Sequence, residues 1–222
     1  MLLAVDTSTR MVGIALYDGS QVLAEMTWSS HSYHTVELAP SVDAMLEKTG
    51  ISVGELSALG VATGPGSFTA LRIGLAFVKG LAFSEHLPII GIPTLEIVAA
   101  AQPFADTQMA CVLVAGRRRL AVGWYQVVEN KWESMGNLDN LTLDEFAESI
   151  REPTRICGEL NDEVRQRLGR KYKNVVLASP AFSVRRPAIL AELAWQRWEA
   201  GHVDNPATLS PTYLHHGEPI PG

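Results

Sequence analysis

The chain has 222 residues, of which 47% are hydrophobic, and a formal net charge of −6, so it is long and apolar enough for one large globular domain or two small ones. The acidic balance argues against a protein that grips nucleic acid by itself, because phosphate binding needs a basic surface, and the most apolar stretch, 73–83, is too short to cross a bilayer. Since the N-terminus lacks a basic, cleavable leader and the two cysteines, Cys111 and Cys157, are far apart, we expect a cytoplasmic protein with free thiols.

The first half of the chain predicts three strands followed by alternating helices and strands. Apolar runs bounded by turn residues indicate strands at 2–6, 12–17 and 22–27, which should form a meander. The remaining predicted elements of this half are a helix at 36–48, a strand at 59–62, a helix at 68–84, a short strand at 89–90 and a helix at 94–101.

A glycine-rich turn joins the strand at 59–62 to the helix at 68–84. Gly64 and Gly66 permit backbone angles or close approaches that a Cβ would forbid. Ser67 is a plausible N-cap for the helix that follows.

The helix at 68–84 carries more apolar surface than one sheet can cover. On a wheel of about 100° per residue, apolar and small residues fill more than half the circumference and leave a wedge around Thr69, Arg72 and Lys79. The surface beyond the core-facing stripe must therefore meet another helix of the same chain or a partner subunit. The pattern alone leaves open a helix enclosed within one domain.

The second half repeats this order of elements. Its predicted elements are strands at 110–115, 120–128 and 132–135, a helix at 143–150, a strand at 154–157, a helix at 159–168, a strand at 175–177 and a helix at 187–200. The repetition predicts a duplicated α/β fold with an N-terminal domain at 1–104 and a C-terminal domain at 105–222. Basic clusters at 117–119, 165–173 and 185–186 are expected to be solvated faces and turn ends.

This duplication, opening with residues 4–9 before a strand that starts at Val12, resembles the actin, sugar-kinase and heat-shock-chaperone ATPase superfamily. The resemblance implies two actin-like ATPase (ribonuclease H-like) domains, each a mixed β-sheet with flanking helices. It also implies that the first hairpin turn faces nucleotide phosphates, which makes Asp6, Thr7 and Ser8 candidate phosphate-loop residues. Asp6 could equally accept hydrogen bonds from backbone amides of its own turn.

A more specific resemblance is to the TsaB (YeaZ) family. It is carried by residues 4–8, by His34-Thr35, by the runs 64–74 and 80–82, and by Pro211-Thr212-Tyr213-Leu214. It implies a non-catalytic subunit that binds and activates a TsaD-like enzyme, which transfers a threonylcarbamoyl group to the tRNA adenosine beside the anticodon. The partners that it implies are TsaD, a TsaE-like ATPase, a second copy of the chain when the enzyme is absent, and tRNA through the complex.

The same resemblance implies where the partner binds. The helices at 36–48 and 68–84 would pack against equivalent helices of the TsaD-like enzyme. The candidate interface residues are Leu38, Thr69, Arg72, Ile73, Ala76, Phe77 and Gly80.

Catalytic groups of the superfamily are replaced in this chain. Where the sister enzyme family has two metal-binding histidines, the aligned residues are Thr94 and Val98, which cannot replace imidazole as a metal ligand. Where relatives commonly have Asp-Ala-Arg, the run here is Ala115-Gly116-Arg117, without a carboxylate for magnesium. We therefore expect no catalytic residue, metal or cofactor, with ATP or ADP at a subunit boundary left open. The alternatives are an ATP-dependent small-molecule kinase and an M22-type metallopeptidase.

Overall fold

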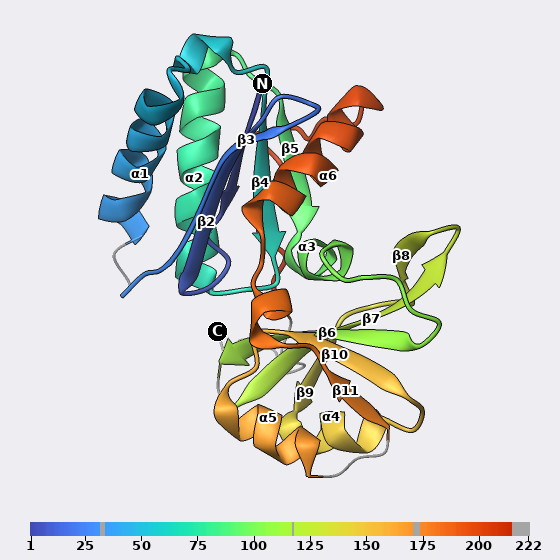
Figure 1. Cartoon of the computed structure of the whole chain (residues 1–222). Helices are drawn as coiled ribbons and strands as arrows, with labels where there is room; N and C mark the ends of the chain where they lie inside the picture. Colours follow the sequence, from blue (N-terminus) through green and yellow to red (C-terminus); the bar gives the residue numbers. More distant parts are fainter. Residues whose placement is uncertain (32–33, 117, 171–173, 215–222) are drawn as a thin grey trace. The chain divides into compact units, whose positions relative to one another are not determined.

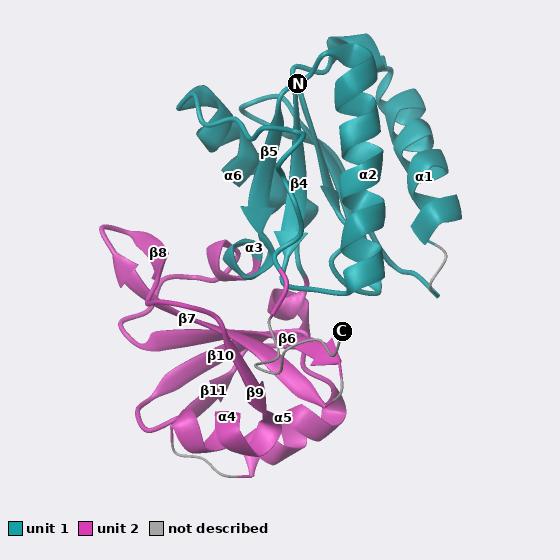
Figure 2. Cartoon of the chain, turned by 180° about the vertical axis from the view of Figure 1, so that it is seen from behind, with its two compact units in different colours: residues 1–97, 185–212 teal, residues 98–184, 213–222 magenta. Residues whose placement is uncertain are grey.

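The structure is a computed structural model that describes residues 1–31, 34–116, 118–170 and 174–214 (Figure 1). It divides into two compact units. Unit 1 comprises residues 1–97 and 185–212, and unit 2 comprises residues 98–184 with the described residues 213–214 (Figure 2). Within the described ranges, no helix combines the length and apolar character needed to span a membrane.

Unit 1 is built on a five-stranded mixed sheet in the order β3-β2-β1-β4-β5. The predicted meander is formed by three antiparallel strands, β1 (Leu2–Asp6), β2 (Met11–Tyr17) and β3 (Val22–Ser29). Strand β4 (Ala58–Gly64) pairs parallel with β1, and β5 (Ile89–Pro93) pairs parallel with β4. Every residue of β1 and β4 is buried, because helices cover both faces of the sheet.

Two helices cover one face of this sheet and a third covers the other (Figures 1 and 2). Helices α1 (His34–Thr49) and α2 (Phe68–Glu85) pack on the face that carries Val5 and Ile14, and α6 (Pro187–Glu199) packs on the face that carries Ala4 and Ala15. Helix α6 approaches the sheet closely at Gly60, where a Cβ would lie 2.8 Å from the Cβ of Ala194. A short 3₁₀ turn (Val53–Glu55) precedes β4, and α3 (Thr94–Ala100) follows β5.

Unit 2 contains a six-stranded sheet. Its order is β11-β10-β6-β7-β8, and β9 pairs with β7 beside that path. The strands are β6 (Gln108–Gly116), β7 (Arg119–Val128), β8 (Lys131–Ser134), β9 (Asp139–Thr142), β10 (Thr154–Gly158) and β11 (Val175–Leu177). Helices α4 (Leu143–Ser149) and α5 (Asp162–Gly169) lie together on one face of this sheet (Figure 1), and a 3₁₀ turn (Pro180–Ser183) follows β11.

Three features differ from the sequence-based expectations. In place of one division at 104/105, the chain passes between the units after residues 97, 184 and 212, because α6 returns to unit 1 and buries Leu190 and Ala194 against its sheet. Strand β9 was not predicted, since its sequence is polar. Helix α5 begins at Asp162 instead of 159, because Gly158 has a positive φ of 111° and Asn161 caps the helix by accepting a hydrogen bond from the Val164 N–H.

The two cysteines are free, as expected, although the fold brings them together. Cys111 on β6 and Cys157 on β10 are register partners on neighbouring parallel strands, and their Sγ atoms are 3.4 Å apart. Both side chains are fully buried. Burial, followed by the hydrogen bond with Cys157, raises the pKa of Cys111 well above its usual value, so this thiol stays protonated at neutral pH.

Candidate functional site

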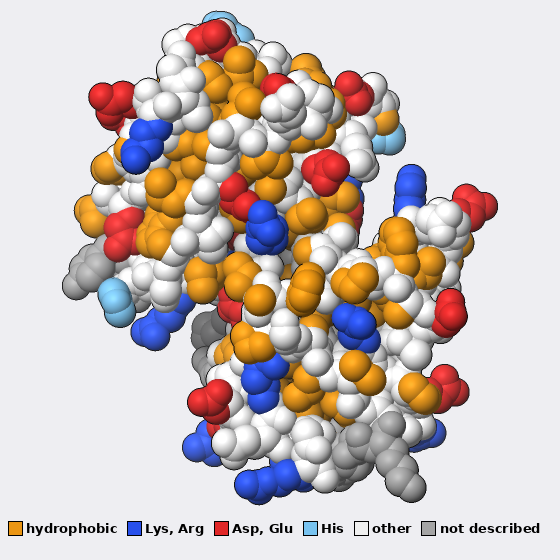
Figure 3. Space-filling view, viewed as in Figure 1, with side chains coloured by type: hydrophobic (Ala, Val, Ile, Leu, Met, Phe, Trp, Pro, Cys, Tyr) orange, Lys and Arg blue, Asp and Glu red, His pale blue; other side chains and the backbone are white. Residues whose placement is uncertain are grey.

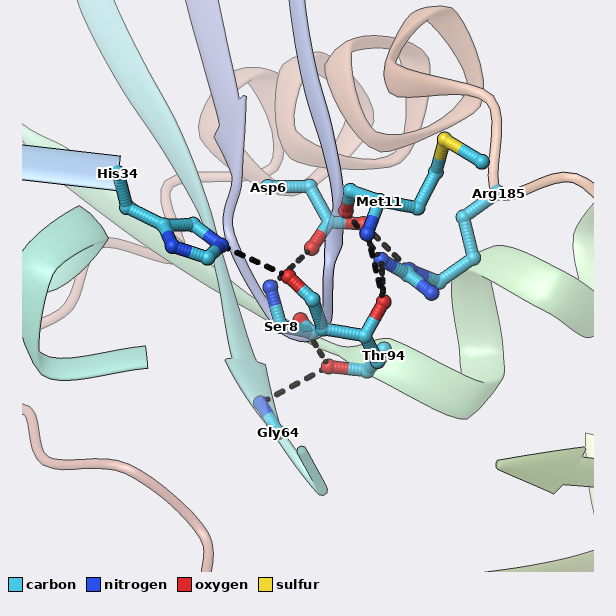
Figure 4. Close-up of polar contacts among 8 residues, drawn as sticks. Asp6, Ser8, Met11, His34, Gly64, Thr94 and Arg185 are labelled. Atoms are coloured by element: carbon cyan, nitrogen blue, oxygen red, sulfur yellow. Dashed lines mark hydrogen bonds and ion pairs between the residues drawn. The ribbon is translucent and has the colours of Figure 1, made fainter. Parts of the chain in front are cut away.

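The first hairpin turn of unit 1 is held by a buried ion pair (Figure 4). Asp6 lies at the end of β1, and its Oδ1 accepts a hydrogen bond from the Ser8 N–H at 2.8 Å. Its Oδ2 accepts one from Nε of Arg185 at 2.7 Å, and the two side chains are only 3% and 1% exposed. Arg185 also donates to the carbonyl of Met11 and the hydroxyl of Thr9, so the guanidinium lies inside the turn.

Arg185 is the residue of this site that the sequence did not identify. Its cluster with Arg186 was expected to be a solvated turn end, and that prediction is wrong for Arg185, which is buried, while Arg186 is half-exposed. Only long-range packing distinguishes the two arginines, since 179 residues separate Arg185 from Asp6. No local pattern in the sequence carries that information.

The other two phosphate-loop candidates are also buried and hydrogen-bonded. The Thr7 hydroxyl donates to the carbonyl of Ala70 at 2.7 Å. The Ser8 hydroxyl pairs with Oγ1 of Thr94 at 2.8 Å, and Oγ1 of Thr94 accepts a hydrogen bond from the Gly64 N–H at 3.0 Å (Figure 4). The turn is therefore joined to the start of α2, to the end of β4 and to α3.

Glycines allow the β4–α2 turn to lie against the hairpin turn. A Cβ at Gly66 would collide with the Ser8 carbonyl, which accepts a hydrogen bond from the Ser67 N–H at 2.7 Å. A Cβ at Gly74, in the second turn of α2, would collide with Oγ1 of Thr7. The predicted need for a close approach at Gly66 is confirmed, and Ser67 is the N-cap of α2, with its hydroxyl accepting from the Ala70 N–H.

Thr94 has a structural role in this network. The resemblance places it where the sister enzyme family has a metal-binding histidine, and here its buried hydroxyl bridges Ser8 and Gly64. His34 at the start of α1 is also buried, with Nε2 3.0 Å from the Thr9 carbonyl oxygen. In the ranges that the structure covers, no three His, Cys, Asp or Glu side chains are grouped closely enough to hold a metal.

Helix α2 presents an apolar stripe on its outer side, and we call this stripe the α2 face. Of the expected interface residues, Thr69, Arg72, Ala76 and Gly80 are exposed, with Ile73 and Phe77 half-buried beside them. Phe83, which the sequence did not single out, extends the stripe and is 86% exposed. The α2 face consists of Thr69, Arg72, Ile73, Ala76, Phe77, Gly80 and Phe83. In Figure 3, hydrophobic side chains are scattered among polar ones over the side of unit 1 where Figure 1 draws α1 and α2.

Leu38 does not belong to the exposed surface. It is only 2% exposed, because it shares the core-facing stripe of α1 with Val42 and Met45. The exposed residues of α1 include Val36, which is 65% exposed, Ala39 and Asp43. Leu38 therefore packs in the core of unit 1 and is not available at the surface to contact a partner, contrary to what the sequence had led us to expect.

The segment after α6 covers the other flank of α2. Lys79, expected in the polar wedge of the helix, donates from Nζ to the Leu209 carbonyl at 2.6 Å. Thr212, from the Pro-Thr-Tyr-Leu run, donates its N–H to the Thr63 carbonyl at 2.7 Å. The α2 helix is thus covered by the sheet, by α1 and by this segment. On the α2 face, Ile73 and Phe77 also pack partly against the core, whereas Ala76, Gly80 and Phe83 are exposed.

The β6–β7 hairpin of unit 2 contains the run that replaces Asp-Ala-Arg. Ala115 is half-buried and Gly116 has a positive φ of 78°, whereas Arg117 lies outside the described residues. Arg118 also adopts a left-handed conformation, with φ at 60°.

Comparisons with known proteins agree with this architecture. A family model described as TsaD, tRNA N6-adenosine threonylcarbamoyltransferase, matches residues 21–184. The "tRNA threonylcarbamoyladenosine biosynthesis protein TsaB" of Bacillus subtilis is 33% identical over 154 residues, which cover 69% of this chain and 67% of the relative. The protein of the same name from Haemophilus influenzae is 28% identical over 224 residues, covering 96% and 92%.

A solved structure, YeaZ from Pseudomonas aeruginosa, has the same fold. It superposes with a TM-score of 0.79 at 24% identity and covers 96% of this chain and 99% of its own. Together with the sheet orders of the two units, it confirms the predicted duplicated α/β fold with mixed sheets and flanking helices.

Proposed function

Because the chain belongs to the TsaB (YeaZ) family and so has a role in tRNA threonylcarbamoyladenosine biosynthesis, we propose that it is a non-catalytic subunit that binds and activates a TsaD-like transferase. In this proposal, the transferase modifies the tRNA adenosine beside the anticodon, and this chain contacts the transferase through the α2 face. The tRNA is bound through the complex.

The observation that carries the proposal is the exposed apolar character of the α2 face. An aromatic ring as exposed as that of Phe83 leaves a large apolar area in water, and burial against a partner would remove it. The small residues Ala76 and Gly80 at the centre of the face would let a partner helix approach closely. Arg72, whose Cζ lies 3.6 Å from the ring centroid of Phe68, supplies a cation near one end.

The hairpin turn supports a non-catalytic role. A kinase of the superfamily would need Asp6 beside magnesium and phosphate, whereas Asp6 here is committed to Arg185 and to the Ser8 amide. Thr7 and Ser8 are likewise bonded inside the fold. A magnesium-bound nucleotide that used the Asp6 carboxylate would have to compete for it with Arg185.

The α2 face also accounts for the other protein partners that we propose. A second copy of the chain would cover the same face when the transferase is absent, because the stripe is apolar and can pack against itself. Homodimer and heterodimer would then be mutually exclusive. A TsaE-like ATPase would bind the assembled complex instead of this face.

The decisive experiment mixes the purified chain with a TsaD-like transferase and measures mass by light scattering. Ala76→Arg should weaken the complex at least about 100-fold, because it places a charge at the centre of the apolar contact. The matched control is Val176→Arg, which puts the same side chain on an exposed valine of β11 in unit 2 and should leave binding unchanged. Unchanged binding of Ala76→Arg, or equal loss in both variants, would place the partner elsewhere.

The alternative functions predict activities of the isolated chain. A small-molecule kinase would turn over ATP with an acceptor and no partner, and a metallopeptidase would retain zinc or iron after purification. ATP turnover by the chain alone, or a stoichiometric metal in elemental analysis, would overturn the non-catalytic role. Neither result would bear on the binding of the transferase, which the light-scattering experiment tests separately.

A further inference from the structure

Unit 2 holds the two cysteines of the chain against each other, and the function proposed above does not use them. Cys111 on β6 and Cys157 on β10 are register partners on neighbouring parallel strands, although 46 positions separate them in the sequence. Parallel strands lie about 4.8 Å apart, which is within the Cα–Cα range of about 4.4–6.8 Å that disulfides span. The fold therefore places the two thiols where a bond can join them.

Both cysteines point to the side of the sheet opposite to α4 and α5. Their strand neighbours Ala110, Val112 and Ile156 belong to the core beneath these two helices, and successive side chains of a strand alternate between the two faces. The 3₁₀ turn at Pro180–Ser183 lies on the cysteine side of the sheet (Figures 1 and 2) and contacts β10. This turn is therefore part of what covers the cysteine side.

Gln102, which follows α3, attaches this turn to the rest of unit 2. Its Nε2 donates to the Phe182 carbonyl at 2.6 Å, and its backbone carbonyl accepts a hydrogen bond from Nε1 of Trp132 at 3.1 Å. Its Oε1 is buried, and no residue in the described part of the chain donates a hydrogen bond to it. A buried oxygen without a donor lowers the stability of the closed arrangement. Local opening is thereby favoured at this attachment.

In the closed fold, the two thiols are protected from reaction. Both side chains are fully buried, so a reagent in solution cannot reach them. Burial also raises the pKa of Cys111 well above its usual value, and only the thiolate is the nucleophile in thiol–disulfide exchange. Oxidation of the pair therefore requires a local opening of unit 2 on the cysteine side.

We propose that Cys111 and Cys157 are a redox-sensitive switch, in which an oxidant of the low-molecular-weight disulfide class reversibly joins them and ties β6 to β10. One cysteine thiolate attacks a sulfur of the oxidant, which forms a mixed disulfide and releases one thiolate. The second cysteine thiolate attacks the cysteine sulfur of the mixed disulfide and releases the other. Two cysteine thiols are oxidised to one disulfide, and the oxidant is reduced to two thiols, which take up the two cysteine protons.

The strand geometry makes this disulfide easy to reduce. Opposed Cβ atoms of parallel strands are about as far apart as the strands, whereas a disulfide brings them to about 3.8 Å, so closing the bond draws β6 and β10 together by about 1 Å. A disulfide strained in this way is reduced more readily than a structural one. While it lasts, it prevents the two strands from separating.

The test incubates the full chain with oxidised glutathione, alkylates the remaining thiols in denaturant and measures the mass. The wild-type chain should lose two hydrogen atoms, take up no alkylating reagent and give a linked pair of peptides that contain Cys111 and Cys157. Oxidation should be faster in urea below the unfolding transition, because urea favours the opening. Reduced glutathione should then restore both thiols.

Two matched variants and one further measurement show that the bond acts on the strands. Cys111→Ala and Cys157→Ala each leave one thiol, so neither can form the bond within one chain. In hydrogen–deuterium exchange, residues 108–116 and 154–158 of the oxidised wild type should exchange at least about tenfold more slowly than in the reduced protein, a modest effect for a disulfide. The same treatment should leave exchange in both variants unchanged.

Several results would overturn the proposal. These are thiols that stay free until the whole chain unfolds, a glutathione adduct that persists on one cysteine of the wild type, or disulfides that join two chains. Exchange that is unchanged or faster after oxidation would also overturn it, as would a disulfide that reduced glutathione does not open. All of these measurements use the isolated chain, so they are independent of the binding of a transferase.

Discussion

The Asp6–Arg185 pair determines what the first hairpin turn can do. A guanidinium inside a protein is tolerated only when its donors are matched, and Arg185 donates to a carboxylate, a hydroxyl and a carbonyl. It occupies the interior side of the turn that the superfamily resemblance assigns to phosphates. The charge on Asp6 is thereby used to stabilise the fold.

Asp6→Asn should therefore act on stability. The substitution leaves the Arg185 charge buried without its counter-ion, and the free energy of unfolding should fall by about 3–5 kcal/mol. Urea unfolding of the isolated chain measures this loss. The control is Asp18→Asn, the same change at an exposed turn carboxylate that accepts hydrogen bonds from Ser20 and Gln21, which should lower stability far less than Asp6→Asn does. Equal losses in the two variants would contradict the buried-pair argument.

The Glu25–Arg186 pair should make stability depend on pH. Burial raises the pKa of Glu25, but hydrogen bonds from Arg186 and from the Ala188 N–H outweigh it, so the pKa is lower than its usual value of 4.5. A carboxyl group with a lowered folded-state pKa adds stability above its unfolded pKa, and this stability is lost as the pH falls through the folded-state pKa.

Glu25→Gln tests this dependence. At neutral pH it should lower the free energy of unfolding by about 1 kcal/mol, a small value because Arg186 is half-exposed. At about pH 3, where the carboxyl group of the unfolded chain is mostly protonated, wild type and variant should differ less. Urea unfolding at the two pH values gives both differences, and a difference that does not shrink in acid would contradict the assignment.

At the scale of elements, α2 has two glycines with different surroundings. Gly74 lies against Oγ1 of Thr7, so the helix can sit close to the hairpin turn only without a Cβ at this position. At Gly80, apart from the helix's own neighbouring backbone, no atom of the described residues lies within 4 Å of the place where a Cβ would be, because Gly80 is on the outward α2 face. One helix thus combines close packing against the hairpin turn with an outward face that is open to solvent.

Gly74→Ala and Gly80→Ala should consequently have opposite effects on stability. Alanine favours the helix by up to about 1 kcal/mol over glycine, and Gly80→Ala should realise this gain. Gly74→Ala should instead lower stability by about 1–3 kcal/mol, because its methyl group overpacks the contact with Thr7. Thermal and urea unfolding at low protein concentration compare the pair, and similar stabilities of the two variants would show that the contact with Thr7 is loose.

At the scale of the whole molecule, unit 1 is discontinuous in sequence. Its sheet is complete by residue 93, yet one face remains without cover until α6 arrives from residues 187–199. That face carries Leu2, Ile90 and Ile92, all fully buried in the complete chain. The fold of the first unit therefore depends on the end of the chain.

A fragment of residues 1–104 should fail to fold stably, because removal of α6 exposes this apolar face to water. Residues 1–97 joined to 185–214 through a flexible glycine–serine linker should fold, since they contain every element of the unit. Near-ultraviolet circular dichroism and cooperative unfolding distinguish the two fragments. A cooperatively folded 1–104 fragment would show that α6 is dispensable.

The sequence by itself determined the positions of most helices and strands, because hydrophobic period and turn residues are local properties. It also determined the close approach at Gly66, the N-cap at Ser67 and the outward side of α2, which follow from spacing within one element. Only the tertiary structure decided that Arg185 is buried beside Asp6, that Leu38 is a core residue, and that α6 completes the first unit. Each of these depends on which distant segment covers a given surface, and the free energy of burial belongs to that contact rather than to either segment alone.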